Sequence, residues 1–250
     1  MLQRKNDHQW VNIGVYLMGL DSFSHAYHQL RGGMAQALGQ DSKGQRATGA
    51  AFHVGDGVYV TAAHIATLRH LRIVPASGNG VGREITVSGS DILTAGDDRV
   101  DVALLRTEAV ANVDLLIGTN WDDVIRDEDL MGWPILLMGF PVIPDSISAV
   151  LVMAPGHIAA VIDRDKRKHV HYVTSALPRS GFSGSPLVVA VKDPWVMGVL
   201  TSALTPVGKP TEVGFGAAVS IEPVWHLLDK YNLAPGANAE LIHAVRGAGG

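Results

Sequence analysis

Gly181-Phe182-Ser183-Gly184-Ser185-Pro186 is the stretch of sequence from which the fold can be inferred. Its serine lies between two glycines, and the apolar run Leu187–Val191 follows. Glycine at position 181 permits a sharp turn and a close approach of a ligand to the backbone. Such a turn can direct the N–H groups of Gly181 and Ser183 toward one point, which is the geometry of an oxyanion hole. Taken alone, the hexapeptide is better interpreted as an ordinary Gly/Ser/Pro turn.

Two further motifs lie upstream of this stretch. Val60-Thr61-Ala62-Ala63-His64 ends a short apolar strand at a histidine, and Asp101-Val102-Ala103-Leu104-Leu105 begins an apolar strand with an aspartate. An imidazole titrates in the range needed to take a proton from a serine hydroxyl, which is otherwise a poor nucleophile. A carboxylate beside the ring can fix its tautomer and stabilise the imidazolium. The order His64, Asp101, Ser183 therefore predicts a catalytic triad.

Each motif also has a simpler interpretation. His64 alone could be a buried, hydrogen-bonded histidine, and Asp101 alone could cap the end of a strand. Asp97 and Asp98 are alternative carboxylates, but Asp101 is the one that directly precedes the apolar strand. The joint presence of three motifs in this order favours the catalytic interpretation.

Together the motifs resemble those of the trypsin/chymotrypsin-like serine proteases. They are similar to the cysteine-free bacterial branch, which includes the Deg proteases and the glutamyl endopeptidases, and the resemblance spans about residues 47–230 by order of elements. It implies a serine endopeptidase that cleaves protein or peptide substrates through an acyl-enzyme, without a cofactor. The implied catalytic residues are His64, Asp101 and Ser183, and the implied oxyanion hole is formed by Gly181 and Ser183.

The resemblance also locates a substrate pocket, with Leu177, Ala203, Gly214 and Gly216 as its walls. Leu177 stands where trypsin-like enzymes carry the acid that selects lysine or arginine. Because burying an unpaired charge is costly, we expect the pocket to accept a small to medium apolar side chain. Phe182 replaces the acid that pairs with a cleaved N-terminus in animal digestive members, so that route of activation is closed.

The composition supports a folded, enzyme-like chain. Its 250 residues include 47% hydrophobic and 18% charged residues, which argues against disorder over most of the length. A net charge of −4 argues against general binding to nucleic acid or to an anionic membrane surface. The absence of cysteine excludes disulfides, zinc-thiolate sites and a cysteine nucleophile, and favours a bacterial or intracellular protein. We recognise no signal peptide or membrane span and expect a cytoplasmic location.

The distribution of short strands and turns predicts an all-β protein of two six-stranded antiparallel β-barrels, with a C-terminal helix and an N-terminal extension. We divide the chain into an N-terminal extension (1–46), a first barrel with His64 and Asp101 (47–120), an acidic linker (121–132), a second barrel with Ser183 and a closing helix (133–232), and a tail (233–250). The expected strands are 50–54, 58–61, 71–75, 84–87, 102–106, 135–139, 149–153, 157–162, 169–175, 187–191, 196–202 and 214–219.

The N-terminal extension is expected to contain a strand and helical segments. Trp10–Met18 has a β-rich, partly alternating pattern, whereas 24–38 is more helical and is interrupted by Gly32-Gly33. A short helical segment is expected after His64, and a closing helix over 223–231 has a proline in its first turn.

Other site types fit the sequence less well. His169 and His171 share a strand face and, with His157, suggest a metal site. Because no carboxylate is placed beside them, we interpret them as polar residues of a basic hairpin and predict no metal. The acid cluster within 121–132 is interpreted as a solvated linker. A catalytically silent, protease-like module that grips a peptide remains the alternative function, and a regulatory protein partner is a further expectation.

Overall fold

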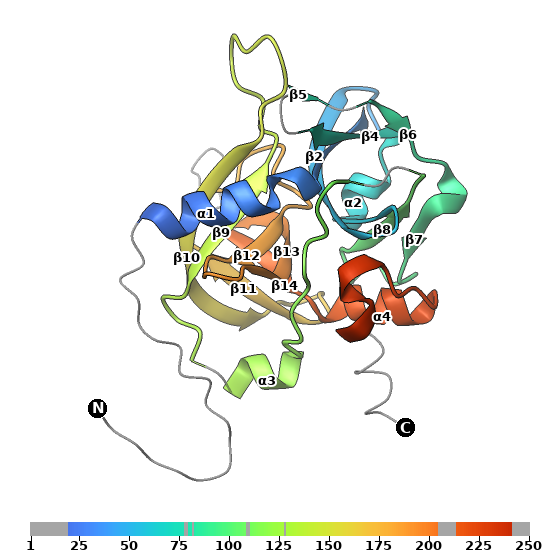
Figure 1. Ribbon diagram of the computed structural model, residues 1–250. Helices are drawn as coiled ribbons and strands as arrows, with labels where there is room; N and C mark the ends of the chain where they lie inside the picture. Colours follow the sequence, from blue (N-terminus) through green and yellow to red (C-terminus); the bar gives the residue numbers. More distant parts are fainter. Residues whose placement is uncertain are drawn as a thin grey trace, which may run out of the picture.

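The computed structural model describes residues 20–77, 80–81, 83–108, 111–127, 129–204 and 214–241 as two antiparallel β-sheets with a few short helices (Figure 1). The predicted strand at Trp10–Met18 lies outside the described residues. None of the described helices is both long enough and apolar enough to cross a membrane.

The first sheet is open. Its strands follow the order β5-β4-β1-β2-β3-β8-β7, and β6 pairs with β4. Within the described residues this sheet has eight strands and forms a half-barrel, in place of the six-stranded barrel expected from the sequence. Its strands are β1 (Met34–Gln40), β2 (Arg46–Gly55), β3 (Val58–Thr61), β4 (Arg69–Ser77), β5 (Gly80–Val81), β6 (Ile85–Thr86), β7 (Ile92–Thr94) and β8 (Ala103–Arg106).

The second sheet is a closed barrel of six strands in the order β10-β11-β14-β13-β12-β9. The all-β class and this six-stranded antiparallel barrel are therefore confirmed. Its strands are β9 (Pro134–Gly139), β10 (Val152–Asp163), β11 (Val170–Thr174), β12 (Pro186–Val189), β13 (Trp195–Leu204) and β14 (Phe215–Ser220).

The separate strands predicted at 149–153 and 157–162 are wrong, because one strand, β10, runs from Val152 to Asp163. Pro155 and Gly156 indicated a break between them. In the structure β10 pairs with β9 over Val152–His157 and with β11 over Ile158–Asp163, so it changes partner just after this dipeptide. Gly156 lies close against Ala176, where a side chain would overlap the neighbouring backbone.

The helical prediction for 24–38 is correct only for its first part. Helix α1 spans Leu20–Leu30, and η1 (Arg31–Gly33) leads into strand β1 at Met34. Met, Ala and Leu favour helices, but β1 pairs with β2 on one side and β4 on the other, and this pairing overrides local propensity. The first sheet thus begins inside the range assigned to an N-terminal extension. The remaining helices are α2 (Ala63–Ala66), η2 (Gly89–Asp91), α3 (Asp122–Asp127), α4 (Glu222–Lys230) and η3 (Gly236–Asn238).

The connection between the two sheets is folded rather than a fully solvated linker. It contains α3, and the first residue of that helix, Asp122, accepts a hydrogen bond from Ser220 Oγ at 2.6 Å and contacts His169 Nδ1 at 3.0 Å. The solvated-linker interpretation is therefore wrong for Asp122, whose carboxylate has partners on the second barrel.

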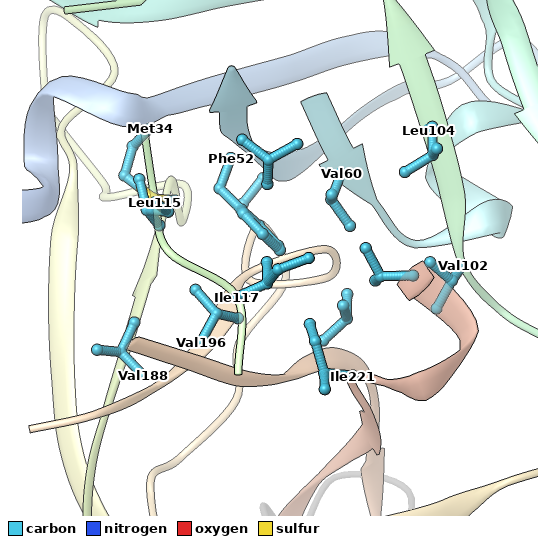
Figure 2. Close-up of a cluster of buried hydrophobic side chains, with 14 of the residues drawn as sticks. Met34, Phe52, Val60, Val102, Leu104, Leu115, Ile117, Val188, Val196 and Ile221 are labelled. Carbon is cyan, nitrogen blue, oxygen red and sulfur yellow. The ribbon is translucent and has the colours of Figure 1, made fainter. Parts of the chain in front are cut away.

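One hydrophobic cluster joins the two sheets (Figure 2). Phe52, Val60 and Leu104 from the first sheet lie in the same buried cluster as Val188 and Val196 from the second barrel. The connecting segment fills the space between them with Leu115 and Ile117, both almost fully buried. Because apolar burial is the main stabilising term in folding, this shared core fixes one sheet against the other.

Candidate active site

The pairing of β3 with β8 brings two distant acid–base residues together. In this antiparallel register Thr61 lies opposite Ala103. His64 lies three residues after Thr61, within α2, and Asp101 lies two residues before Ala103, so both residues lie just beyond the same end of the strand pair. This arrangement follows from the sequence pattern, since each polar residue borders a buried apolar strand.

His64 and Asp101 are joined by two donors. The backbone N–H of His64 donates to Asp101 Oδ1 at 3.0 Å, and His64 Nδ1 lies 2.9 Å from Asp101 Oδ2. The carboxylate therefore fixes both the position of the ring and the nitrogen that carries the proton. Burial raises the pKa of the Asp101 carboxyl, but the hydrogen bonds and charge of His64 outweigh burial and hold that pKa below its usual value.

The alternative carboxylates have other surroundings. Asp97 accepts hydrogen bonds from the backbone N–H and the guanidinium of Arg99, which hold its pKa well below the usual range. No hydrogen bond joins Asp98 to His64 in the described part of the chain. Of the three acids in this loop, Asp101 is thus the one that contacts the histidine.

Ser183 lies in the loop between β11 and β12 and is attached to the first sheet through its backbone. Its carbonyl oxygen accepts a hydrogen bond from Ala50 N at 2.8 Å. The next residue, Gly184, has φ +87°, and a Cβ there would overlap the Ala50 carbonyl oxygen and Thr61 Oγ1 and lie 3.1 Å from Ala62 N. The serine loop therefore packs against the end of β3, three residues before His64.

Within the residues that the structure describes, no hydrogen bond joins Ser183 Oγ to His64. The backbone contacts of Ser183 and Gly184 nevertheless place the serine loop beside the segment that leads to His64. Catalytic hydrogen bonds are often long in structures without substrate and shorten in the reactive complex.

Two backbone amides of the serine loop are available to a ligand. Gly181 has φ +97°, and a side chain there would overlap the Phe140 carbonyl oxygen, so only glycine fits. In the described part of the chain, neither Gly181 N nor Ser183 N donates a hydrogen bond to a protein acceptor, whereas the N–H of the intervening Phe182 donates to Arg179 O. Gly181 and Ser183, which were predicted to form an oxyanion hole, thus have free N–H donors among the described residues.

The residues proposed as pocket walls lie on neighbouring strands. Ala203 on β13 is opposite Gly216 on β14, and Gly216 is opposite Thr174 at the end of β11. Leu177 follows β11 and is 50% exposed. Gly214 directly precedes β14 and is half-buried. That these residues receive a substrate side chain stays a prediction.

The basic hairpin tip between β10 and β11 lies beside the acid loop, which is the loop that carries Asp97, Asp98 and Asp101. This contact was not indicated by the sequence. Lys168 N donates to Arg99 O at 3.3 Å, so the tip between β10 and β11 packs on the loop that carries Asp101. From the same tip, Arg164 Nη1 donates to Ser202 Oγ on β13 at 2.8 Å. The sequence offered only a run of charges on this hairpin, with no sign of what it contacts.

The fold is that of known serine proteases. The chain matches the active form of the Rv3671c protease from M. tuberculosis with a TM-score of 0.64 and 15% identity, over 95% of this chain and 97% of that one. It matches the HtrA-type protease AlgW, solved with a tripeptide, with a TM-score of 0.60 and 19% identity over 84% of this chain. A serine endoprotease from Yersinia pestis gives a TM-score of 0.60 and 20% identity over 83% of this chain.

These likenesses establish the trypsin-like, HtrA-type fold. The chain spans 62% of the AlgW chain and 65% of the Yersinia chain. No protein-family model matches the sequence, and no curated protein matches it.

Proposed function

We propose that the protein is a serine endopeptidase in which Ser183 is the nucleophile, His64 the general base and Asp101 the residue that orients the base. The observation that carries this proposal is the double contact of His64 with Asp101, set beside a serine loop whose two free amides are those of Gly181 and Ser183. The shared fold with HtrA-type serine proteases supports it.

Each residue of the candidate site has a separate role in the proposed reaction. His64 Nδ1 donates to Asp101, so Nε2 carries the lone pair that takes the Ser183 proton as Oγ attacks the scissile carbonyl. The N–H groups of Gly181 and Ser183 stabilise the oxyanion of the tetrahedral intermediate. The imidazolium then gives its proton to the leaving amine and leaves an acyl-enzyme. Water activated by His64 hydrolyses the ester and restores the serine.

The substrate we propose is a protein or peptide with a small to medium apolar residue before the scissile bond. Leu177 supports this specificity, because its apolar side chain would offer no partner to a charged side chain of the substrate.

We also propose that a protein partner controls the peptidase activity. The segment between β9 and β10 projects from the barrel (Figure 1) and exposes Val142, Ile143 and Ile147. It continues directly from Phe140, whose N–H donates to Gly181 O at 3.0 Å. A partner that covered these apolar side chains would act on the backbone that forms the oxyanion hole.

Cleavage of a mixed peptide library by the wild type and by Ser183→Ala, followed by mass spectrometry, tests the function. We expect new peptide ends with the wild type and none with the variant. Binding of library peptides by both proteins without cleavage by either, also after addition of candidate partners, would favour the silent binding module instead.

A further inference from the structure

Three side chains from two distant segments form a cluster on the second barrel, apart from the serine loop. His169 directly precedes β11, and Glu222 and His226 lie one turn apart on the same face of α4. One ring nitrogen of each histidine and one carboxylate oxygen of Glu222 all lie within 4.8 Å of one another. Glu222 Oε1 is 3.6 Å from His226 Nε2 and 3.9 Å from His169 Nδ1.

A second carboxylate orients one of these imidazoles. Asp122 Oδ2 lies 3.0 Å from His169 Nδ1 and also accepts the Val170 N–H, while its Oδ1 accepts from Ser220 Oγ. The same Nδ1 lies 3.9 Å from Glu222 Oε1, so one ring nitrogen of His169 faces both carboxylates. A metal ion bound at this nitrogen would replace the proton between the ring and Asp122, because metal ligation requires an unprotonated imidazole nitrogen.

The charges and exposure of the cluster favour a cation. Asp122 and Glu222 are both acidic, and within the described residues each contacts only histidine, not lysine or arginine, as an ion-pair partner. Glu222 Oε2 accepts the Asp122 N–H at 2.7 Å, which leaves Oε1 toward the histidines. The side chains of His169 and Glu222 are 5% and 18% exposed, whereas that of His226 is 56% exposed and provides access from solvent.

We propose that His169, Glu222 and His226 bind one Zn²⁺ ion, beside the Asp122 carboxylate that contacts the same His169 nitrogen. Two imidazole nitrogens and a carboxylate oxygen are a common zinc ligand set, and the open side at His226 leaves a fourth position for water. Zinc–ligand bonds of about 2.0–2.2 Å require the donor atoms to approach to within about 3.5 Å of one another. The exposed His226 side chain can rotate toward Glu222, and the 3.9 Å between His169 Nδ1 and Glu222 Oε1 requires a small shift of the Glu222 side chain.

The site would join three parts of the fold. Asp122 begins α3, Glu222 and His226 belong to α4, and His169 follows Lys168, whose N–H donates to Arg99 in the acid loop. Zinc would thus hold the basic hairpin against the helix that closes the second barrel. Zinc binding here is independent of the proposed peptidase activity.

The sequence pattern suggested a possible metal site elsewhere, although no metal was predicted. That candidate site consisted of His157, His169 and His171. In the structure His171 is buried, with Nδ1 hydrogen-bonded to His169 O, whereas His157 is exposed on β10. His157 therefore provides a matched control, because it is an exposed histidine of the alternative group.

Isothermal titration of the chelator-treated, full-length chain with zinc chloride tests the inference. We expect one zinc ion per chain for the wild type, with affinity at least about tenfold weaker in His226→Ala and in Glu222→Gln. Asp122→Asn should weaken binding by about tenfold or more through loss of the negative charge beside the His169 nitrogen, and His157→Ala should bind as the wild type does. The thermal midpoint should rise with zinc in the wild type and in His157→Ala, but not in His226→Ala.

Circular dichroism of each variant without zinc separates loss of binding from loss of folding. His226 is exposed, so its alanine variant is expected to remain folded. An absence of zinc binding by the folded wild type, a loss of affinity below about tenfold in the folded His226→Ala variant, or equal weakening in His157→Ala would overturn the assignment.

Discussion

His64 contacts Asp101 through both its backbone N–H and its ring Nδ1, at 3.0 and 2.9 Å. The backbone contact ties the carboxylate to the start of α2, and the ring contact sets the tautomer. Since the side chain of Asp101 is only 12% exposed while that of His64 is 44% exposed, the acid is held under the ring and the base faces outward. The pair is thus oriented before any substrate binds.

We expect Asp101→Asn to lower the rate of peptide cleavage by about four orders of magnitude, because the amide would favour the wrong ring tautomer. His64→Ala should cost at least as much, and the double variant should cost little more than either single one, since the residues act as a unit. Steady-state kinetics on one peptide substrate measures all three.

Asp98→Asn is the matched control for the carboxylate. It lies in the same loop without a contact to His64 among the described residues, so its activity should remain close to that of the wild type. Equal damage from Asp98→Asn and Asp101→Asn would show that the orienting acid has been assigned incorrectly.

Gly184→Ala should destabilise the protein by about 3 kcal/mol or more, because φ +87° is strained for alanine and the new methyl group would overlap the Ala50 carbonyl oxygen. Gly44 is the matched control: it has φ +79° but nothing within 4 Å of an added Cβ. Gly44→Ala should cost only about 1 kcal/mol for the backbone. Denaturant unfolding of both variants measures the difference, and equal losses would argue against the tight packing of the serine loop.

Leu177→Asp should give the enzyme some activity toward peptides with lysine or arginine before the scissile bond, while the wild type should favour Ala, Val, Leu or Met there. The physical reason is that a carboxylate would pair with a charge that the wild-type pocket leaves unpaired. A peptide library varied at this one position makes the comparison. A wild-type preference for a charged residue would mean that the pocket walls lie in another part of the chain.

Tyr59→Phe should leave stability at neutral pH unchanged or raise it by about 1 kcal/mol, since the buried Tyr59 hydroxyl has no hydrogen-bond partner among the described residues. Burial raises the pKa of Tyr59 from its usual value near 10 to about 12. The unfolded chain therefore loses this proton first, and between pH 10 and about 12 the wild type should lose up to about 1.4 kcal/mol of stability per pH unit from this residue. Urea unfolding across that range should show a shallower loss in the variant, and parallel curves would count against the buried tyrosine.

Much of the candidate site could be predicted because it is encoded in short local motifs. The glycines at 181 and 184 flank Ser183 at positions where the backbone has positive φ, so turn chemistry was visible in six residues. His64 and Asp101 each border an apolar strand, and the β3–β8 register then places them together.

Features that depend on distant partners were missed. Met34–Leu38 has the propensity of a helix, and only pairing with β2 and β4 makes it a strand. Asp122 resembled part of an exposed acid run, because its contacts come from residues about 50 and 100 positions further along the chain. The same separation concealed Glu222 and His226 as neighbours of His169.

Labelling with a fluorophosphonate probe, read by mass spectrometry of the digested protein, tests the central claim most directly. The probe reacts with an activated serine and forms a stable phosphonyl ester, so it reports the nucleophile without requiring a known substrate. We expect the probe to modify Ser183 in the wild type and to modify no residue in Ser183→Ala. Modification of the neighbouring Ser185, or of no serine in a folded sample with and without candidate partners, would contradict it.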